Sequence, residues 1–542
     1  MAAMRASESA PLPATAGNAG PLARRTSARA ERANEQRNLR DRLVPPMPPA
    51  SLWGWAGPLL ITLFGGFLRF YRLGVPRAVV FDETYYVPDA WSILKHGVEF
   101  NHQKNINALL VSGSTHVLTS PAEYVAHPPL GKAMIAVGEW LFGLTPFGWR
   151  FSVALVGTIS ILMTARIARR MTRSTLLGCV AGLLMALDGL ELVMSRTAIL
   201  DGLVMFWVLA AFGMLVLDRD ASRAKLADLT ERAPPSRLAG GGPPLGIRWQ
   251  RVLAGVFLGA ACATKWNGLW YLFAFGGLAL AWDIGARRAL GYRDRLGGVL
   301  RSDVKWLPVT FGAIPLATYT LAWSGWFASS QGYDRNWAAS VGNHTPIWSV
   351  LDSWYQYQKS MLSFGLGLQS HGSYTSYAWT WIVLGRPVSM FYATPKTCGT
   401  SSCSQEVLAV GTPAIWWASA LALIFCALWW VGRRDWRAGA VLVGVAGGWL
   451  PWFWFAIHDH RTEYYFYAIV FLPYLIIAIT LCLGLIIGPA RAAPGRRATG
   501  AIIAGGYLLL TLTNFAYLYP VLAAQVLPYS SWYQRMWFHS WV

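Results

Sequence analysis

The segment Phe466–Ile487 reads FYAIVFLPYLIIAITLCLGLII and contains no charged residue. A helix that crosses the hydrocarbon core of a bilayer needs about 20 mostly apolar residues, because its backbone groups must find their hydrogen-bond partners within the helix. Comparable apolar runs recur from Leu52 onward, and the chain of 542 residues is 54% hydrophobic and only 13% charged. A soluble domain carries about twice that charged fraction. The sequence therefore predicts an all-α polytopic membrane protein.

Eleven apolar segments are predicted to span the membrane. An odd number of spans places the two termini on opposite sides, and most of the 46 Lys and Arg lie in segments that share a side with the N-terminus. Because positively charged loops stay in the cytoplasm, we expect a cytoplasmic N-terminus and an extracytoplasmic C-terminus. The predicted spans are Leu52–Leu73, Trp149–Ile167, Leu176–Leu187, Ile199–Leu217, Val252–Ala263, Gly268–Trp282, Leu307–Phe327, Pro413–Val431, Ala438–Ile457, Phe466–Ile487 and Thr499–Tyr519.

The basic charge of the chain follows this topology. Residues 1–50 carry eight arginines among Ala, Ser and Pro, without the apolar run of a signal peptide. We interpret them as a disordered basic cytoplasmic tail, followed by one membrane domain over residues 51–542. The formal net charge of +20 is then an orientation signal. It does not indicate a nucleic-acid partner.

Two long polar regions, residues 75–148 and 328–411, fall on the predicted outer face. Large loops gathered on one face usually bind something there, so we expect the chemistry of the protein in these regions. Within the second loop Cys398 and Cys403 flank four small polar or glycine residues. An isolated pair with this spacing favours a small disulfide-closed loop outside the cytoplasm over a metal site.

The first outer loop opens with adjacent carboxylates, Asp82 and Glu83. Adjacent side chains on a helix point about 100° apart, so the two cannot both face one ligand. One can accept a proton from a substrate while the other packs against nearby donors. The alternative is structural, with Asp82 acting as the N-cap of a surface helix.

Several cations stand at outer helix ends, where lipid phosphates lie. Arg150 begins the second span, and its donor fork suits bidentate phosphate contact. His127, Lys132 and Arg461 are further candidates for an anionic headgroup, as are Arg196, Lys265 and Arg335. The structural alternatives are interfacial anchoring and snorkelling. The segment from His458 to Glu463 holds two His and two carboxylates, a weak metal pattern that we interpret as a polar lining for the phosphate pocket.

Four motifs in order resemble the protein O-mannosyltransferase family: Val80-Phe81-Asp82-Glu83, His127-Pro128-Pro129-Leu130-Gly131-Lys132, Ser195-Arg196-Thr197-Ala198-Ile199-Leu200-Asp201 and Thr264-Lys265-Trp266-Asn267-Gly268. The likeness extends over roughly residues 50–520 and implies the GT-C glycosyltransferase fold. It implies that Asp82 and Glu83 are the catalytic carboxylates and that Arg150 matches the arginine of the family at the second span. The family's eukaryotic members carry a MIR domain where this chain has only its second loop. This resembles the actinobacterial branch, which implies polyprenyl-phosphate mannose as donor at the plasma membrane and leaves acceptor selection open.

The resemblance implies a metal-free and cofactor-free transfer of mannose to Ser or Thr hydroxyls with inversion. Asp82 is the first candidate for the general base and Glu83 the second, with Arg150 stabilising the leaving phosphate, helped by Lys132 or Arg461. The acceptor is expected to be an extended Ser/Thr-rich polypeptide. The secretion translocon is a candidate partner that would deliver it. Aromatic residues of the second loop are expected either to flank sugar and peptide or to anchor the loop at the interface. They are Tyr374, Tyr377, Trp379 and Trp381.

Two other functions fit the same sequence. One is a GT-C transferase that moves a different sugar from a polyprenyl phosphate to a lipid or glycan. The other is a membrane transporter, which predicts pseudo-symmetric halves and charges at mid-bilayer depth. We find neither feature in the sequence.

Overall fold

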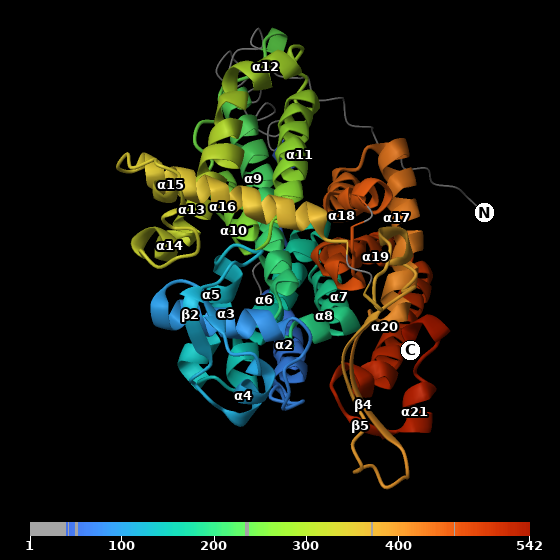
Figure 1. The fold of residues 1–542 in the computed structure, drawn as a ribbon. Coiled ribbons are helices and arrows are strands. Elements are labelled where there is room, and N and C mark those ends of the chain that lie inside the picture. The colour runs from blue at the N-terminus through green and yellow to red at the C-terminus, as the bar shows by residue number, and fades with distance from the viewer. Residues whose placement is uncertain (1–39, 42, 49–51, 233–237, 370–371, 460) are drawn as a thin grey trace, which may run out of the picture.

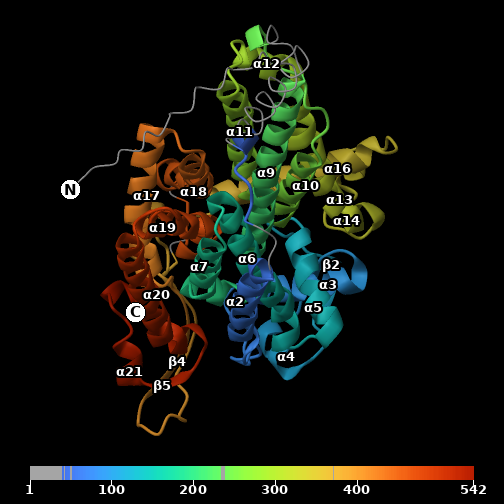
Figure 2. The same cartoon turned by 180° about the vertical axis from the view of Figure 1, so that it is seen from behind.

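The computed structural model describes residues 40–542 except 42, 49–51, 233–237, 370–371 and 460. It is built almost entirely of helices (Figures 1 and 2). Most of the predicted basic tail, residues 1–50, lies outside the described residues. Each of the eleven predicted spans contains or overlaps a helix. These helices are α2 (Trp53–Phe70), α6 (Pro146–Thr172), α7 (Thr175–Ala186), α9 (Leu200–Glu231), α10 (Trp249–Thr264), α11 (Gly268–Ala289), α13 (Ile314–Ala322), α17 (Pro413–Arg433), α18 (Trp436–Trp454), α19 (Leu472–Ile487) and α20 (Pro494–Leu522).

Not all of these helices are long enough to cross a membrane. Within the described residues seven helical segments are long and apolar enough to cross, and Gly54–Phe70 and Thr175–Ala186 are shorter apolar helices. The predicted span Leu307–Phe327 is broken into a π-helical turn η3 (Val309–Ala313), α13 and α14 (Ser324–Ala328). Pro315 lies at the start of α13, where its missing N–H leaves the helical ladder interrupted. The chain is a multi-pass membrane protein.

The most apolar predicted span, Phe466–Ile487, forms the centre of the C-terminal half. It divides into a 3-10 segment η6 (Tyr465–Phe471) and α19, with Pro473 in the first turn of α19. Helices α17, α18, α20 and α7 pack around α19, and its residues from Leu472 to Leu481 are all buried. The N-terminal half is held by contacts of α6 with α2, α7 and α9, and of α10 with α9 and α13.

The two predicted outer loops are folded. The first contains α3 (Glu83–His96), β1 (Phe100–His102), α4 (Ile106–Ser112), β2 (Leu118–Ala122) and α5 (Leu130–Phe142), with β1 and β2 antiparallel. The second contains α15 (Trp337–Ser340), α16 (Trp348–Gly367), η4 (Ala378–Thr380), β3 (Val388–Ala393) and β4 (Cys403–Ala409), and β4 also pairs with β5 (Val526–Pro528) near α21 (Tyr529–Tyr533). The sulfur atoms of Cys398 and Cys403 are bonded within this loop.

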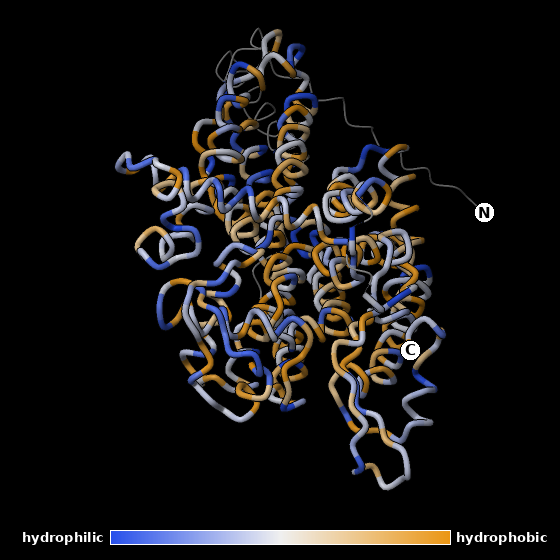
Figure 3. The backbone as a smooth tube through the Cα atoms, viewed as in Figure 1, coloured by the Kyte–Doolittle hydropathy of each residue, from blue (hydrophilic) through white to orange (hydrophobic). Residues whose placement is uncertain are grey.

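One predicted inner segment and parts of both predicted outer loops lie at opposite ends of the molecule, whereas α15 and α16 of the second outer loop lie between them (Figure 1). Helix α12 (Arg295–Ser302), in a predicted cytoplasmic linker, is at the top of Figure 1, whereas α4 and the strands β4 and β5 are at the bottom. The top end carries several hydrophilic stretches and the middle of the bundle is largely hydrophobic (Figure 3). A short helix, α8 (Gly189–Met194), joins the two halves, because Asp188 at its N-cap accepts hydrogen bonds from Thr412 and Trp416.

Candidate active site

Asp82 stands at the N-cap position of α3, as the structural alternative requires, but its side chain makes no capping hydrogen bond. No hydrogen bond among the described residues involves its carboxylate, which is only partly exposed. The preceding Phe81 has φ of +50°, a conformation that bulky residues rarely adopt, and its ring packs against Tyr464 and Phe466. Such strain persists where the surroundings impose it and is concentrated at functional sites. The fold therefore holds Asp82 with its oxygens free.

Glu83 has the opposite environment. Its carboxylate is fully buried, and each of its oxygens accepts two hydrogen bonds. Oε1 accepts from Arg150 Nε and from the backbone N–H of Ala198, at 2.8 and 3.0 Å. Oε2 accepts from Arg150 Nη2 and the backbone N–H of Val80, each at 2.8 Å. In this arrangement Glu83, which the sequence analysis named as the second candidate for the base, has no lone pair left to receive a substrate proton.

Arg150 is saturated in the same way. In addition to the two bonds with Glu83, it donates to the backbone carbonyls of Leu73, Pro76 and Ala78 at 3.3, 2.9 and 2.8 Å. All five guanidinium N–H groups are thus used within the protein. In this structure Arg150 therefore has no N–H group left for the donor phosphate that the sequence analysis assigned to it. The pair instead braces the chain from Leu73 to Glu83 against α6 and so positions Asp82.

A second buried ion pair lies beside Asp82. Lys265, in the turn between α10 and α11, donates to both carboxylate oxygens of Asp201 at 2.9 Å, and its ammonium lies 4.5 Å from the ring centre of Tyr467. Burial lowers the pKa of Lys265, but Asp201, Tyr467 and Asp82 together outweigh burial, and the pKa lies above its ordinary value. Burial raises the pKa of Asp82 to about 6; the charge of Lys265 opposes the rise and that of Asp201 adds to it. Lys265 was among the cations named from the sequence, whereas Asp201 and Tyr467 were not predicted as site residues.

His127 and Arg461 complete the cluster. Burial lowers the pKa of His127 well below its ordinary value, and the nearby charges of Lys265, Lys132 and Arg461 act in the same direction. His127 is therefore a neutral imidazole near pH 7, able to donate or accept a hydrogen bond but not to supply a charge. Arg461 donates through Nε to the carbonyl of Gly365 at 2.8 Å, and its guanidinium lies 5.3 Å from the Trp452 ring centre.

Lys132, a predicted phosphate ligand, contacts protein groups instead. Its buried ammonium pairs with Glu99 at 2.6 Å, lies 3.7 Å from Asp89 and donates to the carbonyl of His127 at 3.1 Å. Lys132 thus donates to two of these partners and lies in the field of the third, and it holds α5 against α3 and the segment before β1. Burial raises the pKa of Asp89 to about 8, which the charge of Lys132 opposes.

Two more of the predicted cations donate hydrogen bonds to carbonyls at the C-terminal ends of helices. Arg196 donates through Nη1 to carbonyls at the end of α2, including those of Arg69 and Tyr71. Arg335 donates to the carbonyls of Trp326 and Phe327 at the end of α14. Cations at such positions satisfy carbonyls that have no partner within the helix. Neither arginine belongs to the cluster around Asp82.

The aromatic residues of the second loop separate into two groups. Tyr377 and Trp379 are about half exposed, and their rings are stacked, with centres 4.6 Å apart. Trp381 is fully buried between Trp452 and Phe471, which corrects the expectation that it contacts sugar or acceptor.

The exposed pair is tied to the site. The carboxylate of Glu463 accepts from the Ala378 N–H at 3.2 Å, and the next residue, Tyr464, packs on Phe81.

Among the described residues no three His, Cys, Asp or Glu side chains are grouped as metal ligands. In the segment from His458 to Glu463, the ring of His458 packs on Trp454 with ring centres 4.0 Å apart. The carboxylate of Glu463 accepts a hydrogen bond from a backbone N–H of the second loop. His460 lies outside the described residues.

Comparisons with known proteins identify the family of the chain. Residues 59–322 match the family described as dolichyl-phosphate-mannose-protein mannosyltransferase, and residues 350–541 match the C-terminal four-helix membrane region of protein O-mannosyltransferase. Relatives from Mycobacterium tuberculosis and Mycolicibacterium smegmatis, both named polyprenol-phosphate-mannose–protein mannosyltransferase, are 39% and 40% identical. The matches cover 91% and 90% of this chain and 93% of each relative. The chain belongs to the protein mannosyltransferase family. The transporter alternative is therefore wrong.

A further member of the family, from Corynebacterium glutamicum, is 34% identical over 92% of this chain and 96% of its own length. Among solved structures, the Saccharomyces cerevisiae protein O-mannosyltransferase Pmt1–Pmt2 complex bound to its sugar donor aligns over 94% of both chains with a TM-score of 0.68 and 12% identity. The Archaeoglobus fulgidus oligosaccharyltransferase aligns over 90% of this chain and 58% of its own, with a TM-score of 0.50 and 14% identity. These likenesses show the GT-C fold, as the resemblance in the sequence predicted.

Proposed function

We propose that this member of the mannosyltransferase family transfers mannose from a polyprenyl-phosphate donor to Ser or Thr hydroxyls of extended polypeptides. The observation that carries the proposal is the contrast between two neighbouring carboxylates. Glu83 is saturated by Arg150 and backbone donors, whereas the Asp82 carboxylate accepts no hydrogen bond from the described residues and lies beside a cluster of cations. The family relatives are named for polyprenol-phosphate mannose and protein, which supports this choice of donor and acceptor.

Asp82 is the general base in this proposal. A pKa of about 6 leaves its carboxylate mostly ionised at neutral pH and makes it a stronger proton acceptor than an ordinary aspartate. General-base catalysis of hydroxyl attack typically contributes about 10²–10⁴-fold. The hydroxyl oxygen forms a bond to the anomeric carbon of mannose while its proton passes to Asp82. The bond to the phosphate oxygen breaks, and the single displacement inverts the configuration at that carbon.

Of the cations that the sequence suggested for the donor phosphate, Lys265 and Arg461 are assigned that role in this proposal, and Arg150 is not. Both cations lie close enough to act on the charge of His127. Their fixed positions suit stabilisation of the phosphate that departs with an additional negative charge, and Asp201 holds Lys265 in the charged state. We propose that no metal takes part, because the leaving group holds one phosphate, whose charge two cations can balance.

The acceptor enters, in this proposal, along the exposed pair of Tyr377 and Trp379, which suits either a sugar or a peptide face. A folded domain would be held away by the surrounding loops, so the acceptor must be extended. We therefore place the reaction at the outer face of the plasma membrane, on polypeptides not yet folded after the secretion translocon. The clustering of Lys and Arg in the predicted inner segments supports this orientation.

The test is mannosyl transfer in membranes supplied with radiolabelled polyprenyl-phosphate mannose and a Thr-rich peptide. Asp82→Asn removes the base without changing size, and we expect transfer to fall at least about 10²-fold while membrane insertion is unchanged. Asp352→Asn, the same change on α16 of the second loop, serves as the matched control. Near-normal transfer by Asp82→Asn removes Asp82 from the role. Transfer of label to lipid extracts and not to peptide favours the GT-C alternative with a glycolipid acceptor.

A further inference from the structure

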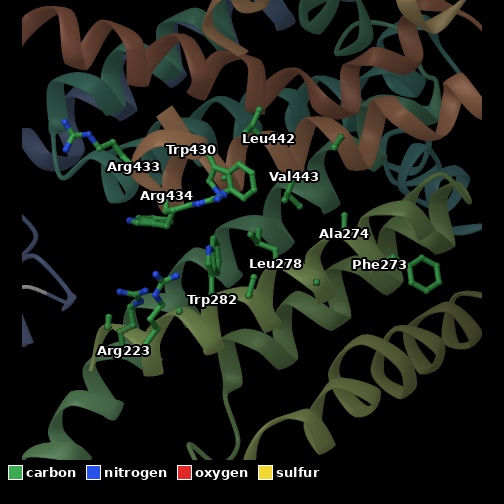
Figure 4. Close-up of a pocket in the computed structure, with 18 residues that line it drawn as sticks. Arg223, Phe273, Ala274, Leu278, Trp282, Trp430, Arg433, Arg434, Leu442 and Val443 are labelled. Carbon is green, nitrogen blue, oxygen red and sulfur yellow. The ribbon is translucent and has the colours of Figure 1, made fainter. Parts of the chain in front are cut away.

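A large groove lies at the α12 end of the molecule, between α11 on one side and α17 and α18 on the other (Figure 4). Its volume is about 1020 Å³, at the upper limit of the range typical of small-molecule sites. Four of its 18 lining residues are arginines, none is acidic, and the others are almost all apolar. The arginines are Arg223, Arg288, Arg433 and Arg434.

The charge of these arginines is not balanced within the described part of the chain. None of the four has a carboxylate within 4.0 Å or a side-chain hydrogen bond, and Nε of Arg223 is buried without a partner. Nearby acidic side chains are already paired with other arginines. These are Asp218, Asp220, Asp228, Asp283, Asp294, Asp303 and Asp435, which pair with arginines at positions 40, 170, 173, 219, 248, 251, 287, 301 and 437. The groove therefore keeps an uncompensated positive charge.

The shape of the groove is that of a site for an amphiphile. Figure 4 shows Arg223, Arg433 and Arg434 at one end and Phe273 at the other, with apolar residues between. From Phe273 to Arg288 the wall follows α11 for 15 residues, about 22 Å at the rise of an α-helix. One leaflet of the hydrocarbon core is about 15 Å thick, so the groove accommodates lipid chains and a headgroup. Space around Gly277 is open, because no atom lies within 4 Å of where a Cβ would be.

We propose that this groove binds one anionic glycerophospholipid. The guanidinium groups receive the headgroup phosphate, for which their donor forks are suited, and the acyl chains lie against α11 and α18. Basic pockets between transmembrane helices are typical sites for such headgroups.

The lipid is not the sugar donor. Lys265 of the catalytic cluster precedes the first residue of α11, and Arg288 is in its last turn, so the two ends are about 30 Å apart along the helix. A phosphate at the groove therefore cannot reach Asp82.

Native mass spectrometry of the full-length protein in detergent tests the proposal, with titration of phosphatidylglycerol, phosphatidylcholine and undecaprenyl phosphate. We expect phosphatidylglycerol to bind at least about tenfold more tightly than phosphatidylcholine. In Arg288→Gln/Arg433→Gln we expect that affinity to fall at least about tenfold. The control Arg293→Gln/Arg295→Gln removes two exposed charges at the same end but outside the groove, and it should bind as the unaltered protein does.

A second variant, Gly277→Leu, blocks the open wall without removing charge, and it should also weaken binding. Leu is a better helix former than Gly, so α11 should remain intact, which melting in lipid-free detergent checks. Equal losses in the groove and control variants overturn the proposal, as does equal binding of phosphatidylcholine. Preference for undecaprenyl phosphate assigns the groove to a polyprenyl lipid instead. A dimer that the groove variants dissociate assigns it to a second copy of the chain, which also overturns the proposal.

Discussion

Replacement of Glu83 by glutamine separates a positioning role from a catalytic one. The amide keeps the size of the carboxylate but has one acceptor oxygen in place of two. The carboxylate oxygens each accept two N–H donors, from Arg150 together with Val80 or Ala198. Whichever way the amide turns, its NH₂ group faces two donors that have lost their acceptor.

The cost follows from that count. Each buried hydrogen bond left unmade costs about 1–3 kcal/mol, so two cost about 2–6 kcal/mol. This agrees with the approximate 3–5 kcal/mol for breaking a buried ion pair by removal of one partner. We expect Glu83→Gln to lower the melting temperature and to reduce kcat, because the loop that carries Asp82 is released. The KM for the lipid donor should change less than about twofold, since neither member of the pair contacts the phosphate.

The assay is steady-state transfer to a Thr-rich peptide at varied donor concentration, combined with thermal unfolding of the purified protein. Glu83→Gln/Arg150→Met, which removes both charges, should recover part of the lost stability. Loss of transfer by Glu83→Gln at an unchanged melting temperature contradicts this reasoning and returns Glu83 to the role of base. A selective rise of donor KM in Arg150→Lys returns the arginine to the phosphate.

Three other measurements probe the cluster. Transfer should decline as pH falls through about 6, where Asp82 takes up a proton, and a decline only near pH 4 would mean that an ordinary carboxyl is the base. Asp201→Asn removes a charge that raises the pKa of Asp82, so the loss of transfer at acidic pH should move to lower pH. Lys265→Met removes a charge that lowers this pKa, so the loss should move to higher pH. Shifts of the same sign in both variants contradict the assignment of Asp82 as the base. Tyr377→Ala/Trp379→Ala should raise the KM for the peptide severalfold with donor KM unchanged, which kinetics at varied peptide concentration will decide; a rise in donor KM instead would place the pair at the lipid.

The spans were predictable because each is a local property of the sequence. Charge-free runs of membrane length, such as Phe466–Ile487, leave few alternatives to a helix. The break in the predicted span Leu307–Phe327 is also local in cause, since it follows from proline. The predicted residue positions of the helices were therefore close to those observed.

The partners of the site residues were not predictable, because they lie far away in the sequence. Arg150 finds its acceptors at Leu73, Pro76 and Ala78, which no spacing rule connects to it. Asp201 begins a span with an acidic first turn, a common helix signal, and only the fold places it against Lys265. The sequence thus named the cations individually but could not show which of them meet, and it assigned the phosphate role first to an arginine that makes all its hydrogen bonds within the protein.

The adjacent carboxylates show why one residue holds the loop in place and another accepts the proton. Asp82 and Glu83 differ by one methylene, but the turn of about 100° between them at the start of α3 directs Glu83 into the core and leaves Asp82 beside the cations. An active carboxylate needs unfilled lone pairs in a partly desolvated place, which is costly unless another interaction holds it there. The bonds that Glu83 makes with Arg150 and two backbone N–H groups supply that interaction within one residue of the base. Exchange of the two residues, Asp82→Glu with Glu83→Asp, should therefore abolish transfer although both carboxylates remain, because the shorter side chain cannot reach all four donors and the longer one displaces the base.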